Sequence, residues 1–163
     1  MLSCVDGTGH LYGTAEQPAM KVETILKAKG GHVVTVQPNA TVGAAIHRLK
    51  LERIGALVVS QNGVELQGMI SERDIVLGLA EHGGGLLDLR VADLMTREVR
   101  TCTPQDSIKH LMGEMTRSRV RHLPVIEHGK LVGIVSLGDV VKNRLEEVEL
   151  EASVLRDAYI AAR

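Results

Sequence analysis

The sequence contains almost no aromatic residues. Its 163 residues include two tyrosines, Tyr12 and Tyr159, and neither phenylalanine nor tryptophan. Proteins that bind single-stranded nucleic acid commonly stack the bases on Phe, Tyr or Trp, so this kind of surface is almost excluded. Because 44% of the residues are hydrophobic, we expect a core of Val, Ile, Leu, Met and Ala.

Cysteine and net charge are also scarce. Cys4 and Cys102 have no C-x-x-C spacing, which argues against a disulfide or a metal site. Nineteen Lys and Arg against twenty Asp and Glu give a net charge of −1, so no overall field draws the chain to nucleic acid or to an anionic membrane. The sequence has no signal-peptide pattern and no run of about 18 apolar residues. We therefore expect a soluble, cytoplasmic protein.

An internal repeat organises the chain. Shifting the sequence by 66 positions, and by 65 after a turn, aligns the same landmarks in two copies: Val33 with Val99, Thr35 with Thr101, Pro38 with Pro104, Ser71 with Ser136, and Asp74 with Asp139. A unit of about 60 residues buries only about 60% of its unfolded surface, so one copy is marginal alone. We therefore expect the two copies to pack together.

Each copy has the same predicted elements. A short strand (33–36 or 99–102) leads into a helix that is N-capped by Thr41 or Ser107, with apolar residues at helical spacing. A hairpin and a second helix follow, with Asn62-Gly63 as the turn in the first copy. This order predicts an α+β fold of two β-α-β-β-α units, whose three-stranded sheets pack together and leave a pseudo-twofold cleft.

The repeat also predicts the domain boundaries. The Gly83-Gly84-Gly85 run indicates a flexible linker between the copies. The expected segments are a flexible N-terminal tail at 1–19, repeat 1 at 20–82, a Gly-rich linker at 83–90, repeat 2 at 91–149, and an extension of the last helix at 150–163.

A Gly-h-h-Ser-x-x-Asp motif, where h is apolar, occurs at the strand-to-helix junction of both copies. It ends in Ser71 and Asp74 in the first copy and in Ser136 and Asp139 in the second. A helix start offers free N–H groups and a positive dipole end, which suit phosphate, and the Asp can accept hydrogen bonds from ribose hydroxyls. The alternative interpretation is a capping box, which stabilises a helix without any ligand. Recurrence of the motif with its glycine favours a binding role.

These features together resemble a tandem pair of cystathionine β-synthase (CBS) domains, a Bateman module. The resemblance covers residues 20–149 and rests on the duplicated unit, the Thr-x-x-Pro turns, His122-Leu123-Pro124-Val125 and the two Ser-x-x-Asp motifs. It implies a stand-alone sensor that binds AMP, ATP, NAD(H) or S-adenosylmethionine between the repeats and regulates a partner. No nucleophile and base are placed for catalysis, so we expect no enzyme, no catalytic residue and no metal.

The resemblance also implies the pocket residues. Ser71, Asp74, Ser136 and Asp139 would hold ribose and nearby phosphate, and the remaining residues would meet adenine or line the walls: Thr35, Val36, Ala56, Leu57, Val58, Thr101, Cys102, Leu123 and Pro124.

The basic residues make the two pockets unequal. We expect Arg121 and His122 to join Arg73 around a phosphate group, because Arg forms two-pronged bonds with phosphate. This ranks the Asp74 pocket first for a phosphorylated ligand. The alternative is that Arg117, Arg119 and Arg121 form a solvated face. A further alternative is that these arginines bind RNA or DNA.

The C-terminal residues predict a long helix with a heptad-like seam. Apolar residues recur at spacings of three and four: Val141, Leu145, Val148, Ala152, Leu155, Tyr159 and Ala162. The seam either folds back on its own domain or packs against a second subunit. We favour a homodimer, and a dimerisation scaffold with empty pockets remains an alternative to the sensor.

Overall fold

The computed structural model describes residues 19–162. The expected tail at 1–19 therefore lies outside the described residues except for Ala19. Helices and short strands alternate along the chain, which confirms the α+β class: α1 (Val22–Lys29), β1 (Thr35–Val36), α2 (Val42–Glu52), β2 (Ala56–Val59), β3 (Gly68–Ser71), α3 (Glu72–His82), the 3₁₀ helix η1 (Gly83–Asp88), α4 (Val91–Leu94), α5 (Ile108–Ser118), β4 (His122–Glu127), β5 (Lys130–Ser136) and α6 (Leu137–Ala161).

The two repeats have unequal sheets. The first has three strands in the order β1-β2-β3, with β1 parallel and β3 antiparallel to β2. The second has only β4 and β5, so the strand predicted at 99–102 is wrong. The chain turns where the amide of Val99 donates to the carbonyl of Arg97 (3.0 Å), and it meets β4 at a single bridge between Cys102 and Val125. The strand predicted at 33–36 is shorter in the structure, where β1 comprises Thr35–Val36.

The predicted N-caps of α2 and α5 are confirmed. Thr41 Oγ1 accepts from the amide of Ala44 at 3.1 Å, and Ser107 Oγ accepts from the amide of His110 at 3.2 Å. Each helix buries one apolar face against the strands of its own repeat.

Helix α1 precedes the first repeat in the sequence, but it packs against the second repeat. Its buried residues Val22 and Ile25 belong to the same hydrophobic cluster as Leu111, Leu123 and Val135 of the second repeat. The amide of Val22 also donates to the carbonyl of Asp106 at 3.0 Å. The stretch 20–29, which the sequence boundaries assign to repeat 1, thus completes the core of repeat 2.

The segment between the repeats makes the reciprocal contact. Residues 83–90 were expected to form a flexible linker, but they contain η1. This segment is held in place by Leu86, which is 1% exposed and belongs to the core of the first repeat. Val91 of α4 is buried in the same cluster, and its amide donates to the carbonyl of Ala40 at 2.8 Å. Each repeat therefore borrows a helix from outside its expected boundaries.

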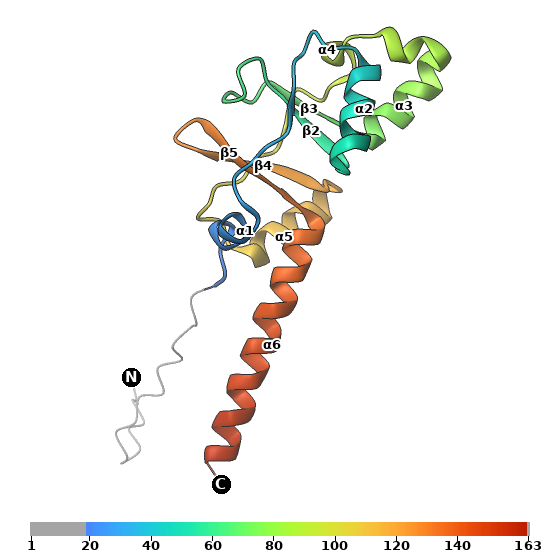
Figure 1. The fold of residues 1–163 in the computed structure, drawn as a ribbon. Coiled ribbons are helices and arrows are strands. Elements are labelled where there is room, and N and C mark those ends of the chain that lie inside the picture. Colours follow the sequence, from blue (N-terminus) through green and yellow to red (C-terminus); the bar gives the residue numbers. More distant parts are fainter. Residues whose placement is uncertain (1–18, 163) are drawn as a thin grey trace, which may run out of the picture.

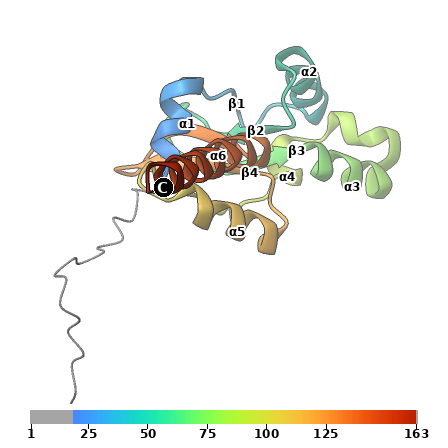
Figure 2. The same ribbon diagram turned by 90° about the horizontal axis from the view of Figure 1, so that it is seen from below.

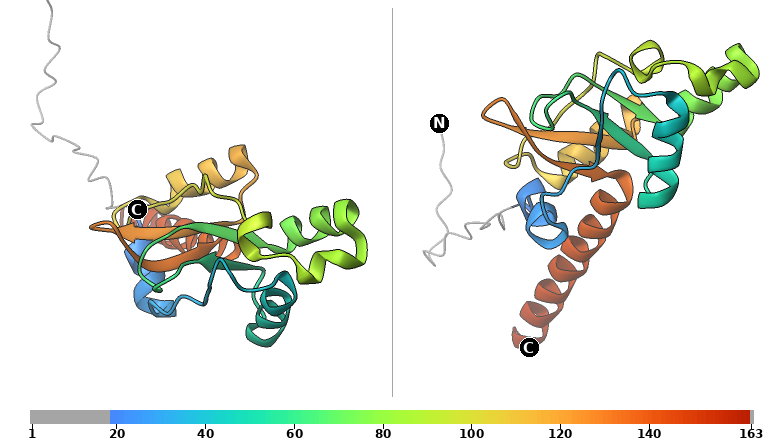
Figure 3. Two further views of the ribbon diagram at one scale, coloured as in Figure 1. Left: turned by 90° about the horizontal axis from the view of Figure 1, so that it is seen from above. Right: turned by 45° about the horizontal axis from the view of Figure 1, so that its top comes forward.

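The two sheets face each other. Side chains alternate along β2, so Leu57 points into the first repeat's core while Val58 points to the opposite face. Val58 is fully buried on that face, and the β4–β5 hairpin of the second repeat lies beside the first repeat's sheet (Figure 3). The amide of Leu131 on this hairpin donates to the carbonyl of Val64 at 2.9 Å. The expected packing of the repeats through their sheets is confirmed.

Helix α6 leaves the body of the molecule. Its first turns pack against α5, β5 and α1, and Val140 is fully buried. Beyond them the helix projects away from both repeats (Figures 1 and 2), and every residue from 148 to 162 is exposed. The alternative in which the seam folds back on its own domain is therefore wrong.

The glycine that opens the first Ser-x-x-Asp motif yields a stability prediction. A Cβ at Gly68 would lie 2.8 Å from both Met95 Sδ and the backbone oxygen of Thr96. Because that backbone is hydrogen-bonded to Met69, it cannot retreat easily. We expect Gly68→Ala to lower the free energy of unfolding by about 1–3 kcal/mol, measured by urea denaturation. Gly84→Ala, with open space around its Cβ, is the matched control, and equal losses in both variants would contradict this account.

Candidate functional site

Both Ser-x-x-Asp motifs form capping boxes. In α6 the amide and the hydroxyl of Ser136 each donate to Asp139 Oδ2 at 2.8 Å, and the Asp139 amide donates back to Ser136 Oγ at 3.2 Å. Ser71 and Asp74 repeat the pattern in α3, with distances of 2.8, 2.6 and 3.4 Å. The capping-box interpretation is thus confirmed in both repeats. The motif fixes each Asp at the start of a helix.

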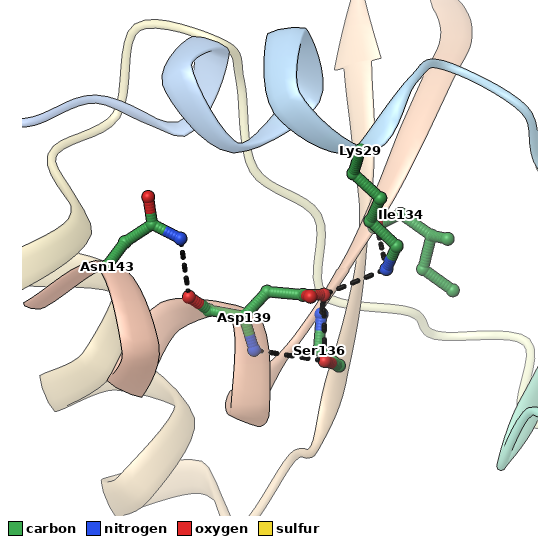
Figure 4. A network of polar contacts seen from close by, with 5 residues as sticks. All are labelled: Lys29, Ile134, Ser136, Asp139 and Asn143. Atoms are coloured by element: carbon green, nitrogen blue, oxygen red, sulfur yellow. Dashed lines mark hydrogen bonds and ion pairs between the residues drawn. The ribbon is translucent and has the colours of Figure 1, made fainter.

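Asp139 has an additional partner that the sequence did not reveal. Lys29, at the end of α1, places Nζ 2.8 Å from Asp139 Oδ2 and 3.5 Å from the carbonyl oxygen of Ile134 (Figure 4). Burial alone would raise the pKa of Asp139, but the hydrogen bonds from Lys29 and Ser136 lower it below its ordinary value. The Asp139 carboxylate therefore stays ionised at neutral pH and holds Lys29 beside it.

Two further basic residues lie next to this carboxylate. His122 pairs with Ser136 across the β4–β5 ladder, and Arg121 precedes it. An open cavity of about 420 Å³ is lined by Arg121, His122, Ser136, Leu137, Gly138 and Val141.

The His122 ring is positioned between the two repeats. Burial, with smaller contributions from Lys29 and Arg121, lowers its pKa, while Glu72 and Asp139 act in the opposite direction. The imidazole is therefore mostly uncharged at pH 7, and a bound anion would favour its protonated form. A Cβ at Gly55 would lie 3.3 Å from His122 Cε1 and from Glu72 Oε2, which places the ring against the first repeat.

The first repeat has no equivalent basic cluster. At the positions of Arg121 and His122 it carries Gly55 and Ala56, as the matching backbone bonds show: Leu137 N donates to Arg121 O, and Glu72 N donates to Gly55 O. Within residues 19–162 no ion pair joins Asp74, whose carboxylate contacts Ser71. Arg73 is exposed and does not line the cavity that holds Arg121 and His122. The expected grouping of Arg73, Arg121 and His122 around one phosphate group stays a prediction.

The expected wall residues fall into two groups. Leu57, Leu123 and Cys102 point into the hydrophobic cores, so only their backbone is available to a ligand. Burial, aided by Asp106 and Glu114, raises the pKa of the Cys102 thiol to about 12, which makes the thiol unreactive. Val36 packs against the core of the first repeat. The other wall positions belong to neither core cluster: Thr35, Ala56, Val58, Thr101 and Pro124.

The strand pairing leaves a backbone edge open in each repeat. β1 pairs Thr35 with Val58 and Val36 with Val59, so it does not extend to Ala56. In the second repeat the amide of Cys102 donates to the carbonyl of Pro124 at 3.0 Å, and the contact does not extend back to His122. The starts of β2 and β4 are therefore the strand segments from which a backbone edge can recognise a ligand.

The structure also limits other chemistry in the described part of the chain. Among residues 19–162, no group of three or more His, Cys, Asp and Glu side chains is arranged to hold a metal ion. No helix in this part is both long and apolar enough to span a bilayer. Arg117 and Arg119 are exposed, and Arg119 ends α5 in the left-handed conformation at φ 52°.

The duplicated α+β unit, with two capped Asp residues flanking the repeat interface, defines the class of two-repeat regulatory modules. The CBS domain model matches residues 29–81 and 91–146, and the chain belongs to the CBS domain family.

Relatives and solved structures agree with this assignment. The mitochondrial CBS domain-containing protein CBSX3 of Arabidopsis thaliana is 34% identical over 85% of this chain and 71% of its own length. CBS domain-containing protein YhcV of Bacillus subtilis is 34% identical over 69% of this chain and 79% of its own. The crystal structure of the CBS-domain containing protein ATU1752 from Agrobacterium tumefaciens has a TM-score of 0.74 at 42% identity, covering 77% of this chain and 99% of that one.

A more distant structure shares the fold. It is a CBS domain pair in complex with 5′-methylthioadenosine and S-adenosyl-L-methionine, with a TM-score of 0.69 at 24% identity, covering 80% of this chain and 99% of that chain. The chain is thus a CBS pair of the regulatory kind, and none of these matches indicates a catalytic family.

The Lys29–Asp139 ion pair predicts a pH-dependent stability. The folded pKa of Asp139 is lowered, so its contribution is present above the unfolded value of about 4 and is lost as the pH falls through the folded value. We expect Lys29→Met to cost up to about 1 kcal/mol at pH 7, a small value because Lys29 is 43% exposed. The cost should vanish in acid, as measured by urea denaturation at several pH values. Lys27→Met, whose ion pair with Glu23 is on the surface, is the control, and equal pH profiles for the two variants would refute the prediction.

Proposed function

We propose that this CBS pair is a regulatory sensor that binds an adenosine-containing nucleotide, such as AMP, ATP or NAD(H), at the interface between its repeats. The observation that carries the proposal is the cluster of Lys29, Arg121 and His122 around the capped Asp139, beside an open cavity. A carboxylate for ribose next to three basic groups for phosphate matches the chemistry of a nucleotide. S-adenosylmethionine, bound by a structural neighbour at 24% identity, is a further candidate.

In the proposed complex the Asp139 pocket takes the phosphate. Arg121 is exposed at the cavity wall and can donate two bonds to one phosphate group. The start of α6 adds the positive end of a 25-residue helix, and Gly138 of its first turn lines the cavity. When ribose hydroxyls bind Asp139, Lys29 Nζ can turn to the phosphate, so the ion pair seen without ligand holds the lysine close to its target. This revises the expected ranking, in which the Asp74 pocket came first.

The Asp74 pocket is proposed to bind ribose without a comparable phosphate site. Asp74 and Ser71 offer the same carboxylate and hydroxyl as the second repeat, but Gly55 and Ala56 replace the two basic groups. Arg73 is the nearest cation in sequence. We expect this pocket to favour a nucleoside part with little negative charge.

Adenine is proposed to lie between aliphatic walls. Its edge would meet the open backbone at the start of β2 or β4, near Ala56 or Leu123, while Val58, Pro124 and the Thr35 or Thr101 segments would cover its faces. No aromatic side chain occurs in residues 20–149, so the base would be selected by backbone hydrogen bonds and shape. A ligand bound across the interface would favour one arrangement of the repeats, which a partner protein could detect.

We further propose that the protein is a homodimer. Exposed apolar side chains are most numerous on two helices, with Val76, Leu77 and Leu79 on α3 and a longer set on α6. Exposed apolar surface of this kind commonly marks a protein–protein interface.

Calorimetry with AMP, ATP, NADH and S-adenosylmethionine tests the nucleotide assignment. For the ligand that binds, Asp139→Asn should weaken affinity about tenfold or more, because bonds to a charged acceptor are lost. Arg121→Ala should lower the affinity for AMP but leave the affinity for adenosine, which has no phosphate, unchanged. Asp93→Asn is the matched control, since Asp93 accepts from the amide of Arg90 at 3.2 Å in the equivalent capping position of α4 and belongs to neither Ser-x-x-Asp motif.

Two results would reject this assignment. One is that the folded protein binds none of the four ligands and releases no adenine compound on denaturation, as detected by mass spectrometry. The other is that Asp139→Asn and Asp93→Asn bind equally well.

A further inference from the structure

The projecting half of α6 carries an apolar seam, several of whose side chains are exposed in the described part of the chain. Leu145, Val148 and Leu155 are 59, 42 and 72% exposed, although they lie at the three- and four-residue spacing of a coiled coil. An isolated helical segment of about 12–15 residues is marginal in water. Residues 148–162 are all exposed within the described part of the chain, so burial of an apolar face contributes little to this part of the helix.

The seam is also sterically accessible beside the body. Val140 and Glu147 mark the side of α6 that faces the body, since Val140 is fully buried and Glu147 accepts from the amide of Met20 at 2.8 Å. At 3.6 residues per turn, the seam lies about 100° around the helix from that side. A second helix can lie along it while the two bodies occupy opposite sides of the pair.

We propose that α6 pairs with α6 of a second copy of this chain as a parallel, in-register, two-stranded coiled coil. This inference rests on the proposed homodimer and specifies its interface. Leu145, Ala152 and Tyr159 occupy the a positions of the heptad, and Val141, Val148 and Leu155 occupy the d positions. Burying these side chains against their copies supplies the hydrophobic driving force.

The charges flanking the seam are complementary in the parallel arrangement. There each g residue faces the e residue five positions later on the partner helix. Arg144, which pairs with Glu147 and Glu151 of its own helix, then faces the partner's Glu149, and Glu151 faces the partner's Arg156. The twofold symmetry repeats both contacts, which gives four attractive pairs.

The antiparallel arrangement with the fullest overlap of the seam has the opposite result. In this antiparallel register Val148 lies against Ala152 of the other helix. Residues at g positions then face g residues of the partner, and residues at e positions face e residues. Glu149 would then face its own copy, Glu151 would face its own copy, and Lys142 would face Arg156. All these contacts are repulsive, so the charges select the parallel pairing.

A matched pair of leucine variants tests the interface in the full chain. Leu155→Asp lies on the seam, and Leu150→Asp lies on the same helix but outside it, with Leu150 56% exposed. We expect Leu155→Asp to raise the dimer dissociation constant about 100-fold, because two leucines lose their burial, and Leu150→Asp to leave it unchanged. Analytical ultracentrifugation over a range of concentrations measures both values.

The outcomes separate this interface from the homodimer itself. A monomeric wild type refutes both. A wild-type dimer that persists in Leu155→Asp refutes the α6 interface and leaves a dimer through another face, such as α3. Equal weakening by both substitutions also refutes the seam, because the seam requires them to differ.

Disulfide trapping tests the orientation. In a Cys4→Ser background, Ala152→Cys should form a symmetric disulfide under mild oxidation, because Ala152 faces itself only in the parallel register. Ser153→Cys, at the next residue and outside the seam, should not. Cys102 is buried and does not compete. Trapping at both positions, or at neither, on a non-reducing gel would overturn the parallel pairing.

Discussion

Neither repeat of this protein encloses its own hydrophobic core. The helix that precedes the first repeat, with Val22 and Ile25, covers the second, and the segment containing Leu86 and Val91 covers the first. Units of this size bury too little apolar surface to be stable alone, and the exchange makes each depend on the other. The interface between the repeats, where His122 lies against Gly55 and Glu72, is for this reason part of the stable fold.

The same exchange gives two nearly identical motifs different surroundings. α1 brings Lys29 to Asp139, whereas no described cation pairs with Asp74. The second repeat adds Arg121 and His122 where the first has Gly55 and Ala56. The charged groups near a carboxylate decide which ligand groups can bind beside it. The two repeats share a fold, but their candidate sites differ in charge.

Local features were predicted well from the sequence. The caps at Thr41 and Ser107 and the paired strands β2–β3 and β4–β5 follow from short-range chemistry, in which a hydroxyl or a turn residue acts within a few positions. The strand at 99–102 and the flexible linker at 83–90 were predicted wrongly. Each depends on a distant surface: one meets β4 only at Cys102, and the other is ordered because Leu86 is buried.

The sequence by itself determined the duplication, the aliphatic core and the capped Ser-x-x-Asp helix starts, because periodicity and capping are properties of neighbouring residues. Only the tertiary structure decided which helix completes which repeat, and that Lys29 meets Asp139 across 110 positions of the chain. It also showed that α6 leaves the body with its seam exposed. Contacts of this kind arise from packing between distant segments, and no local pattern specifies them.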